Sequence, residues 1–311
     1  MTLFLFLLCA VAAILLMGGY YTYRIAFYSP KKGRDKISTF ASHKYDPYRK
    51  EINRLFCQLS DRPYEEVSIV SFDGLTLFGR YYHVKDGAPL DIGFHGYRSS
   101  ALTDFAGGSE LSFSMGHNLL LIDERAHGRS EGRTITFGIQ ERWDVESWVR
   151  YAVERFGADT EIILYGVSMG AATVLMAAGL DLPENVRGII ADCPYSSPGD
   201  IIRKVARDMH MPDQLAWPFV KIGGRVYGGF DVDEMDAARA VKQAKVPILI
   251  IHGESDSFVP CEMSDIVAEN PALVTRYTFP GADHGFSYLV DTPRYREIVT
   301  DFVEKALAPK A

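Results

Sequence analysis

Residues 166–170 place a serine between two glycines, in the order Gly-Val-Ser-Met-Gly. An apolar run typical of a strand precedes them over 161–165, and small helix-forming residues follow over 171–178. A serine on a sharp turn from strand to helix exposes its hydroxyl above the sheet edge, and flanking glycines let the two elements approach closely. The pattern therefore predicts Ser168 as a nucleophile.

Two later loops supply the base and the carboxylate that a nucleophilic serine requires. Asp256 follows the apolar run 246–252, and His284 follows the run 274–279. The carboxyl ends of parallel strands meet at one edge of a sheet, so both side chains are expected near Ser168. The sequence thus predicts a catalytic triad in the chain order Ser, Asp, His.

Other polar residues near these strands are expected to have competing or structural roles. Glu254 and Asp265 compete with Asp256 for the role of the acid, although both lie less well relative to the strand end. His95, after an earlier strand, is expected to shape its turn rather than to act in catalysis. Arg125 is expected to fix the loop in which it lies, because polar groups in loops need internal partners.

The elements that must position these residues follow from the alternation of β-rich and helical stretches beyond about residue 62. This alternation predicts an α/β fold with a mostly parallel sheet and helices on both faces. Asp73-Gly74 is a tight-turn signal, so the first two strands are expected to be antiparallel. The eight strands are expected at residues 66–72, 75–83, 90–95, 118–123, 161–166, 187–192, 246–252 and 274–279.

With these strands and with nucleophile, acid and base in this order, the sequence resembles the α/β-hydrolase superfamily. The motifs that carry the resemblance run from Phe94 to Gly285. The resemblance implies an eight-stranded α/β-hydrolase fold in one domain over 62–311, with a small helical lid. It also implies an oxyanion hole, formed by the backbone N–H groups of Tyr97 and Met169, and no cofactor.

A nucleophilic serine beside an oxyanion hole predicts transfer of an acyl group to the enzyme and then to water. We expect a serine hydrolase of the carboxylesterase or lipase-like kind, acting at a membrane surface on a small-molecule or lipid-like ester. Serine aminopeptidases and acyl-protein thioesterases share the fold and remain alternatives. A non-catalytic ligand-binding module is a remote alternative. Serine in place of aspartate at the nucleophile position disfavours epoxide hydrolase and dehalogenase chemistry.

The first 23 residues contain no charged side chain and an apolar run long enough to cross a hydrocarbon layer of ~30 Å as a helix. We expect a transmembrane anchor at 1–23 rather than a cleaved signal peptide, because no basic region precedes the run and no small-residue cleavage site follows it.

Charge is distributed unevenly along the chain. Residues 24–54 carry 9 Lys or Arg against 3 Asp or Glu, within a basic juxtamembrane linker expected at 24–61. This positive charge after the helix predicts a catalytic domain on the cytoplasmic side of the membrane. The rest of the chain is acidic, since the whole carries a net charge of −7, and this argues against nucleic acid as a partner.

Residues 198–245 interrupt the alternation between the sixth and seventh strands. An insertion of this length with many aromatic residues is expected to form a helical lid over the nucleophile. Trp217, Phe219 and Tyr227 are its candidate substrate-binding residues. The alternative is that these aromatic side chains only pack the lid against the core.

The sequence gives no indication of a metal site. Its four cysteines lack paired spacing, and His127, His210 and His252 have no neighbours at metal-ligand spacing. We therefore expect no metal, and cysteines suited to a reducing compartment.

Overall fold

The computed structural model describes residues 1–30, 43–267 and 269–309. Lys31, Lys32, Arg34 and Lys36 of the predicted basic linker lie outside the described residues. Eight strands form one sheet in the order β1-β2-β4-β3-β5-β6-β7-β8. The strands are β1 (Glu65–Val70), β2 (Thr76–Tyr82), β3 (Leu90–Phe94), β4 (Asn118–Ile122), β5 (Ile162–Val167), β6 (Val186–Asp192), β7 (Ile248–Gly253) and β8 (Val274–Phe279).

The sheet confirms the predicted strands and their directions. Strand β2 pairs antiparallel with both β1 and β4, and every other pairing is parallel. The central strands β3, β4 and β5 are almost wholly buried, as expected for strands covered on both faces. Their carboxyl ends lie at one edge, so loops that follow β3, β5, β7 and β8 converge there.

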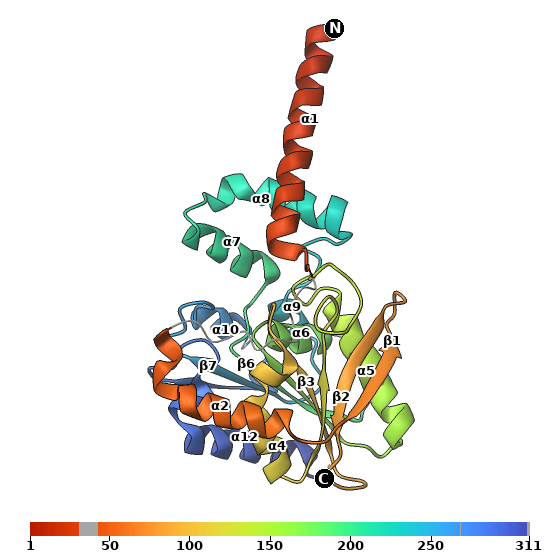
Figure 1. Cartoon of the computed structure of the whole chain (residues 1–311), viewed down its shortest axis with the longest axis vertical. Helices are drawn as coiled ribbons and strands as arrows, with labels where there is room; N and C mark the ends of the chain where they lie inside the picture. Colours follow the sequence, from red (N-terminus) through yellow and green to blue (C-terminus); the bar gives the residue numbers. More distant parts are fainter. Residues whose placement is uncertain (31–42, 268, 310–311) are drawn as a thin grey trace.

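Helices cover both faces of this sheet, and one helix projects from the body (Figure 1). Helices α5, α6 and α9 contribute to the hydrophobic core on one face, and α2, α4 and α12 to the core on the other. The helices are α1 (Thr2–Thr22), α2 (Arg49–Ser60), α3 (Ala101–Asp104), α4 (Ala106–Ser114), α5 (Glu141–Phe156), α6 (Met169–Ala177), α7 (Pro198–Asp208), α8 (Asp213–Ile222), α9 (Ala237–Val241), α10 (Glu262–Val267), α11 (Ser287–Val290) and α12 (Thr292–Leu307).

Helix α2 revises the predicted linker at 24–61. Ile52, Leu55 and Leu59 recur at helical spacing and are buried, while the charged residues of α2 face solvent. Leu55 and Leu59 belong to the same core as α4 and α12. The second half of the predicted linker is therefore part of the catalytic domain.

The end of α1 also joins the body. A short π-helical turn, Tyr23–Phe27, continues the helix, and the Phe27 side chain is fully buried against the rings of Phe137 and Phe230. Ser29 Oγ donates a hydrogen bond to the carbonyl of Ala126, 97 residues away. Residues 23–29, here called the strap, thus pack into the domain rather than forming a free linker.

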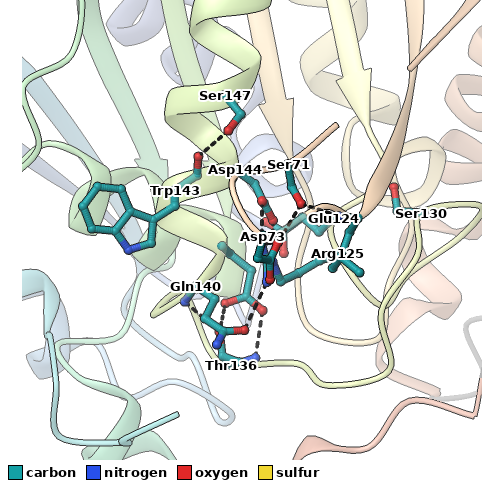
Figure 2. A network of polar contacts seen from close by, with 12 residues as sticks. Ser71, Asp73, Glu124, Arg125, Ser130, Thr136, Gln140, Trp143, Asp144 and Ser147 are labelled. Atoms are coloured by element: carbon teal, nitrogen blue, oxygen red, sulfur yellow. Dashed lines mark hydrogen bonds and ion pairs between the residues drawn. The ribbon is translucent and has the colours of Figure 1, made fainter. Parts of the chain in front are cut away.

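Arg125 fixes the loop between β4 and α5, as predicted. Its guanidinium is buried and donates to both carboxylate oxygens of Asp144, to Asp73 and to Gln140 (Figure 2). Such a two-pronged pairing of guanidinium and carboxylate holds a fixed geometry. The network ties this loop to α5 and to the β1–β2 turn, and the loop in turn contacts the strap.

Candidate active site

Ser168 lies at the turn between β5 and α6, with a left-handed backbone (φ 55°) that non-glycine residues rarely adopt. The flanking glycines make this turn possible. A Cβ atom on Gly166 would lie 2.2 Å from the carbonyl oxygen of Gly170, and one on Gly170 would lie 1.9 Å from that of Phe94. Strand, turn and helix therefore approach more closely than any side chain allows.

The structure brings the three predicted catalytic residues into one hydrogen-bonded chain. His284 Nε2 lies 2.9 Å from Ser168 Oγ, and His284 Nδ1 lies 2.7 Å from Asp256 Oδ2. A carboxylate can only accept, so Nδ1 carries the proton and leaves Nε2 to accept the proton of the serine hydroxyl. This is the arrangement in which a histidine can remove that proton.

Asp256 is held as a carboxylate. Burial raises its pKa, but hydrogen bonds from His252 and His284, together with the backbone N–H of Val259, outweigh burial and hold that pKa below its usual range. Phe258 also donates its backbone N–H to Asp256. The carboxylate is therefore ionised and oriented before any substrate binds.

His252 was not predicted to belong to the site. Its fully buried ring places Nε2 3.2 Å from Asp256 Oδ2 and 3.0 Å from the carbonyl oxygen of Val259. Both are acceptors, so Nε2 carries the proton and donates. Its position at the end of an apolar strand, four residues before Asp256, is the sequence signal that points to this role.

The competing acids lie elsewhere. Glu254 accepts a hydrogen bond from Thr278, and Asp265 pairs with Arg276 at 2.7 Å. His95 donates through Nδ1 to the carbonyl of Gly96 and accepts the backbone N–H of Glu124, so it shapes the turn after β3 as expected.

The two predicted oxyanion donors lie beside Ser168. Met169 is the first residue of α6, where N–H groups have no carbonyl partner within the helix. Tyr97 follows β3 in a turn that Asp104 secures by accepting the N–H of Gly96. Both Tyr97 and Ser168 line one cavity. The positive end of α6 also favours negative charge at this point.

A cavity of about 510 Å³ opens next to the nucleophile. Apolar side chains of α2 and α11 form part of its wall, including Ile52, Leu55 and Leu289, together with Phe258 and Phe286. Ser168 and His284 also line it, together with polar residues such as Arg98 and Asp104. The cavity thus brings both apolar and polar side chains next to Ser168.

Trp217, Phe219 and Tyr227 of the lid were predicted to bind substrate, a role that stays a prediction, and the structure places them apart from the cavity just described. None of the three is among the described residues that line it. The ring of Phe219 lies where a side chain at Gly18 of α1 would be, and the Tyr227 hydroxyl donates to the carbonyl of Leu16.

Trp217 lies under the guanidinium of Arg203, 3.7 Å from its ring centroid, and beside Gly199 of α7. The lid aromatics therefore hold the lid to α1, to α7 and to the core of the body. The apolar surface of α1 buries part of these side chains. The sequence does not indicate which apolar surface a lid will pack against.

The strap holds the loop that carries the predicted oxyanion donor. The Tyr97 hydroxyl donates to the carbonyl of Ala26 at 2.8 Å, and Arg98 Nη2 donates to the carbonyls of Ile25 and Tyr28. The ring of Tyr97 also stacks on Phe137, with centroids 5.0 Å apart. The segment that follows α1 thus supports the active site directly.

Tyr97→Phe should therefore lower kcat several-fold without a matching rise in KM, because it removes the bond to the strap but keeps the ring stacked. Loss of one positioning bond in an oxyanion loop weakens transition-state stabilisation more than substrate binding. Steady-state kinetics on a soluble ester measure the split, with Tyr23→Phe as a control that removes a strap hydroxyl bonded to Thr134 instead. Equal changes in both variants would contradict a specific role for Tyr97.

The residues that line the cavity include a buried acid that the triad does not use. Asp192 Oδ2 accepts the hydroxyl of Tyr295 at 2.8 Å, and Oδ1 has no partner among the described residues. Burial raises the pKa of Asp192 to about 6, although the bond from Tyr295 and the nearby His252 lower it. Near neutral pH the protein therefore holds an under-solvated carboxylate at the cavity wall.

Replacing Asp192 by asparagine should remove a pH dependence of stability. A carboxyl whose pKa is higher in the folded than in the unfolded chain makes the folded state less stable as pH rises from its usual pKa of 3.8 through about 6. The melting temperature of Asp192→Asn relative to the parent chain should accordingly rise between about pH 4 and pH 7. Thermal unfolding at both pH values tests this, and a difference independent of pH would contradict it.

Within the part of the chain that the structure describes, one group of residues has metal-ligand spacing. The donor atoms of Cys193, Asp256 and His284 lie within 4.8 Å of one another. Burial raises the pKa of the Cys193 thiol well above its usual value, which disfavours the thiolate that binds metals. Asp256 and His284 already bond to each other, so these residues do not favour a metal site.

Comparisons with known proteins agree with the fold. A family described as having the α/β hydrolase fold matches residues 93–216. The Bacillus subtilis protein YqkD is 24% identical over 94% of both chains. A thiohydrolase of Aspergillus aculeatus, aneE, is 31% identical over 50% of this chain and 48% of its own.

Solved structures show the same fold. The esterase Pf2001 of Pyrococcus furiosus superimposes with a TM-score of 0.64 and 22% identity, covering 80% of this chain and 93% of the esterase. Est1E of Butyrivibrio proteoclasticus, solved with ferulic acid bound, gives a TM-score of 0.59 and 20% identity over 78% of this chain and all of Est1E.

Proposed function

Since the chain belongs to the α/β-hydrolase superfamily, we propose that it is a membrane-anchored serine hydrolase that cleaves a carboxylic ester through an acyl-enzyme. The observation that carries the proposal is the hydrogen-bonded chain from Ser168 through His284 to Asp256, beside a cavity with a partly apolar wall. The esterases Pf2001 and Est1E support it by their shared fold.

The reaction begins when His284 Nε2 takes the proton of Ser168 and Oγ attacks the carbonyl carbon of the ester. The new oxyanion accepts the backbone N–H groups of Tyr97 and Met169. Asp256 stabilises the positive charge that His284 acquires. When the tetrahedral intermediate collapses, the alkoxide leaves with the proton from Nε2 and the acyl group stays on Oγ.

Water then completes the cycle by releasing the acyl group from Ser168 Oγ. His284 Nε2 takes a proton from water, hydroxide attacks the acyl carbon, and Oγ leaves and regains the proton. No redox step occurs and no cofactor is required.

A thioester substrate is the second candidate, because aneE is named a thiohydrolase. The same nucleophile, base and oxyanion donors serve either leaving group. Rates with matched oxygen and thiol esters of one acyl chain decide between the two.

Covalent labelling tests the proposed function. A fluorophosphonate probe should label the purified chain, and Ser168→Ala should abolish the label. Competition with a series of nitrophenyl esters should then show protection that depends on acyl length. Labelling of Ser168→Ala, or no labelling of the parent chain, would overturn the proposal.

The cavity wall predicts the acyl preference. Leu55→Ala enlarges the cavity at its wall on α2, so preference should move to longer acyl chains, with each further buried methylene contributing about 0.8 kcal/mol until the space is filled. The matched control is Leu59→Ala, which removes a buried leucine of the same helix that does not line the cavity. An equal shift in both variants would show that α2 acts only through stability.

We propose further that α1 is retained as the anchor, with the catalytic domain on the cytoplasmic side. The described residues contain one helix long and apolar enough to cross a membrane, Thr2–Phe27. The side chains of Phe219 and Ile222 of α8 pack against two of its residues, Gly18 and Gly19. The Thr22 hydroxyl donates a hydrogen bond to the carbonyl of Phe219. A removed signal peptide would leave this face of the lid uncovered.

A further inference from the structure

Helix α8 has two apolar faces with different neighbours. Trp217 and Val220 face the body, where they pack with the core below the lid. Leu215, Phe219 and Ile222 recur at the spacing of the opposite face. Because both of these faces of α8 carry apolar side chains, the outer face needs an apolar partner as much as the inner face does.

Helix α1 covers only part of that outer face. Phe219 and Ile222 contact Gly18 and Gly19, whereas Leu215, one turn before Phe219, is 71% exposed. Val226, in the π-helical turn Gly223–Gly228 that follows α8, is 59% exposed. Apolar side chains therefore continue from α1 onto the lid without a protein partner among the described residues.

The depth of α8 follows from the length of α1. At 1.5 Å per residue, the helix Thr2–Thr22 spans about 30 Å, the thickness of a hydrocarbon layer. Its contacts with α8 lie within the last two turns, beside Tyr20 and Tyr21, whose rings suit the level of the lipid headgroups. Figure 1 shows α8 crossing α1 near its end, with α7 between α8 and the body.

We propose that the outer face of α8, carrying Leu215 and continuing to Val226, lies in the lipid interface beside α1. The partner of the lid is then the bilayer surface itself. The inference rests on the proposed anchoring of α1 and adds that the lid is seated at the membrane rather than over Ser168.

Depth-dependent quenching in vesicles tests the proposal. The full chain is reconstituted in phosphatidylcholine and phosphatidylglycerol vesicles, with the accessible Cys9, Cys57 and Cys261 replaced by serine and the buried Cys193 kept. An environment-sensitive nitrobenzoxadiazole label is placed at Leu215→Cys. The control Val70→Cys matches it in exposure, at 71%, but lies on β1 of the body.

A third label separates this inference from the anchor itself. Ile14→Cys lies on α1 and is 56% exposed, so it should be quenched by lipids that carry a nitroxide deep in the acyl chain. The Leu215 label should lose about half its emission to lipids with a shallow nitroxide and resist aqueous iodide, as for a helix lying in the interface. The Val70 label should respond to iodide alone.

Each of the following three results would overturn the inference. If Ile14 is quenched by lipid but Leu215 behaves like Val70, the anchor stands and the lid is not seated in lipid. If Leu215 resists both quenchers, another protein surface covers it, as in a second copy of the chain. If Ile14 also responds only to iodide, α1 is not in the membrane and the anchoring fails too. Retained hydrolysis of a soluble ester in all three labelled chains shows that they are folded.

Discussion

Ser168→Ala should lower kcat by a factor on the order of 10⁴ or more and leave the fold intact. The hydroxyl is the only group that the substitution removes, and it ends a relay in which His284 Nε2 lies 2.9 Å away. Because the relay acts as a unit, His284→Ala should cause a loss of similar size, and the double variant should be little worse than either. Steady-state kinetics on a soluble ester measure all three.

The matched control is Ser287→Ala. Ser287 is also a buried serine at the end of a loop near the cavity, but its hydroxyl has no hydrogen-bond partner among the described residues. Its loss should leave kcat unchanged. Losses in the single variants that multiply in the double variant would show that Ser168 and His284 act separately, which contradicts a triad.

The three residues of the hydrogen-bonded chain were predictable because their signals are local. A glycine-flanked serine after an apolar run fixes both its turn and its place at the sheet edge, and Asp256 and His284 each follow a strand in the same way. Near-continuous apolar runs likewise predicted the buried parallel strands, which carry apolar side chains on both faces, and the Asp73-Gly74 signal predicted the antiparallel pairing of the first two strands.

Contacts between distant segments were not predictable in the same way. The apolar spacing of Ile52, Leu55 and Leu59 is visible in the sequence, yet the surrounding charge favoured a linker. For the lid, the aromatic residues indicate that a surface must be covered, but composition does not name the partner. The partner proved to be α1, and the only local sign of it is the pair Gly18-Gly19 in an otherwise bulky apolar helix.

A second large effect is expected at Gly170, where the added methyl group of Gly170→Ala would overlap the Phe94 carbonyl oxygen at 1.9 Å. Backbone cannot move aside as a flexible side chain can, so β3, β5 and α6 would have to separate at the turn that carries Ser168. We expect destabilisation of roughly 3 kcal/mol or more and loss of ester hydrolysis in any folded fraction. Thermal unfolding and fluorophosphonate labelling measure the two effects.

Gly108→Ala provides the comparison that isolates this overlap. Gly108 is also a helical glycine near the cavity, but there an added Cβ would meet the ring of Tyr165 at 3.4 Å, an ordinary contact. Alanine is the better helix former by about 1 kcal/mol, so this variant should be no less stable than the parent chain. If Gly170→Ala unfolded at the same temperature as Gly108→Ala and kept its label, the close approach of strand and helix would not be what holds Ser168 in its strained turn.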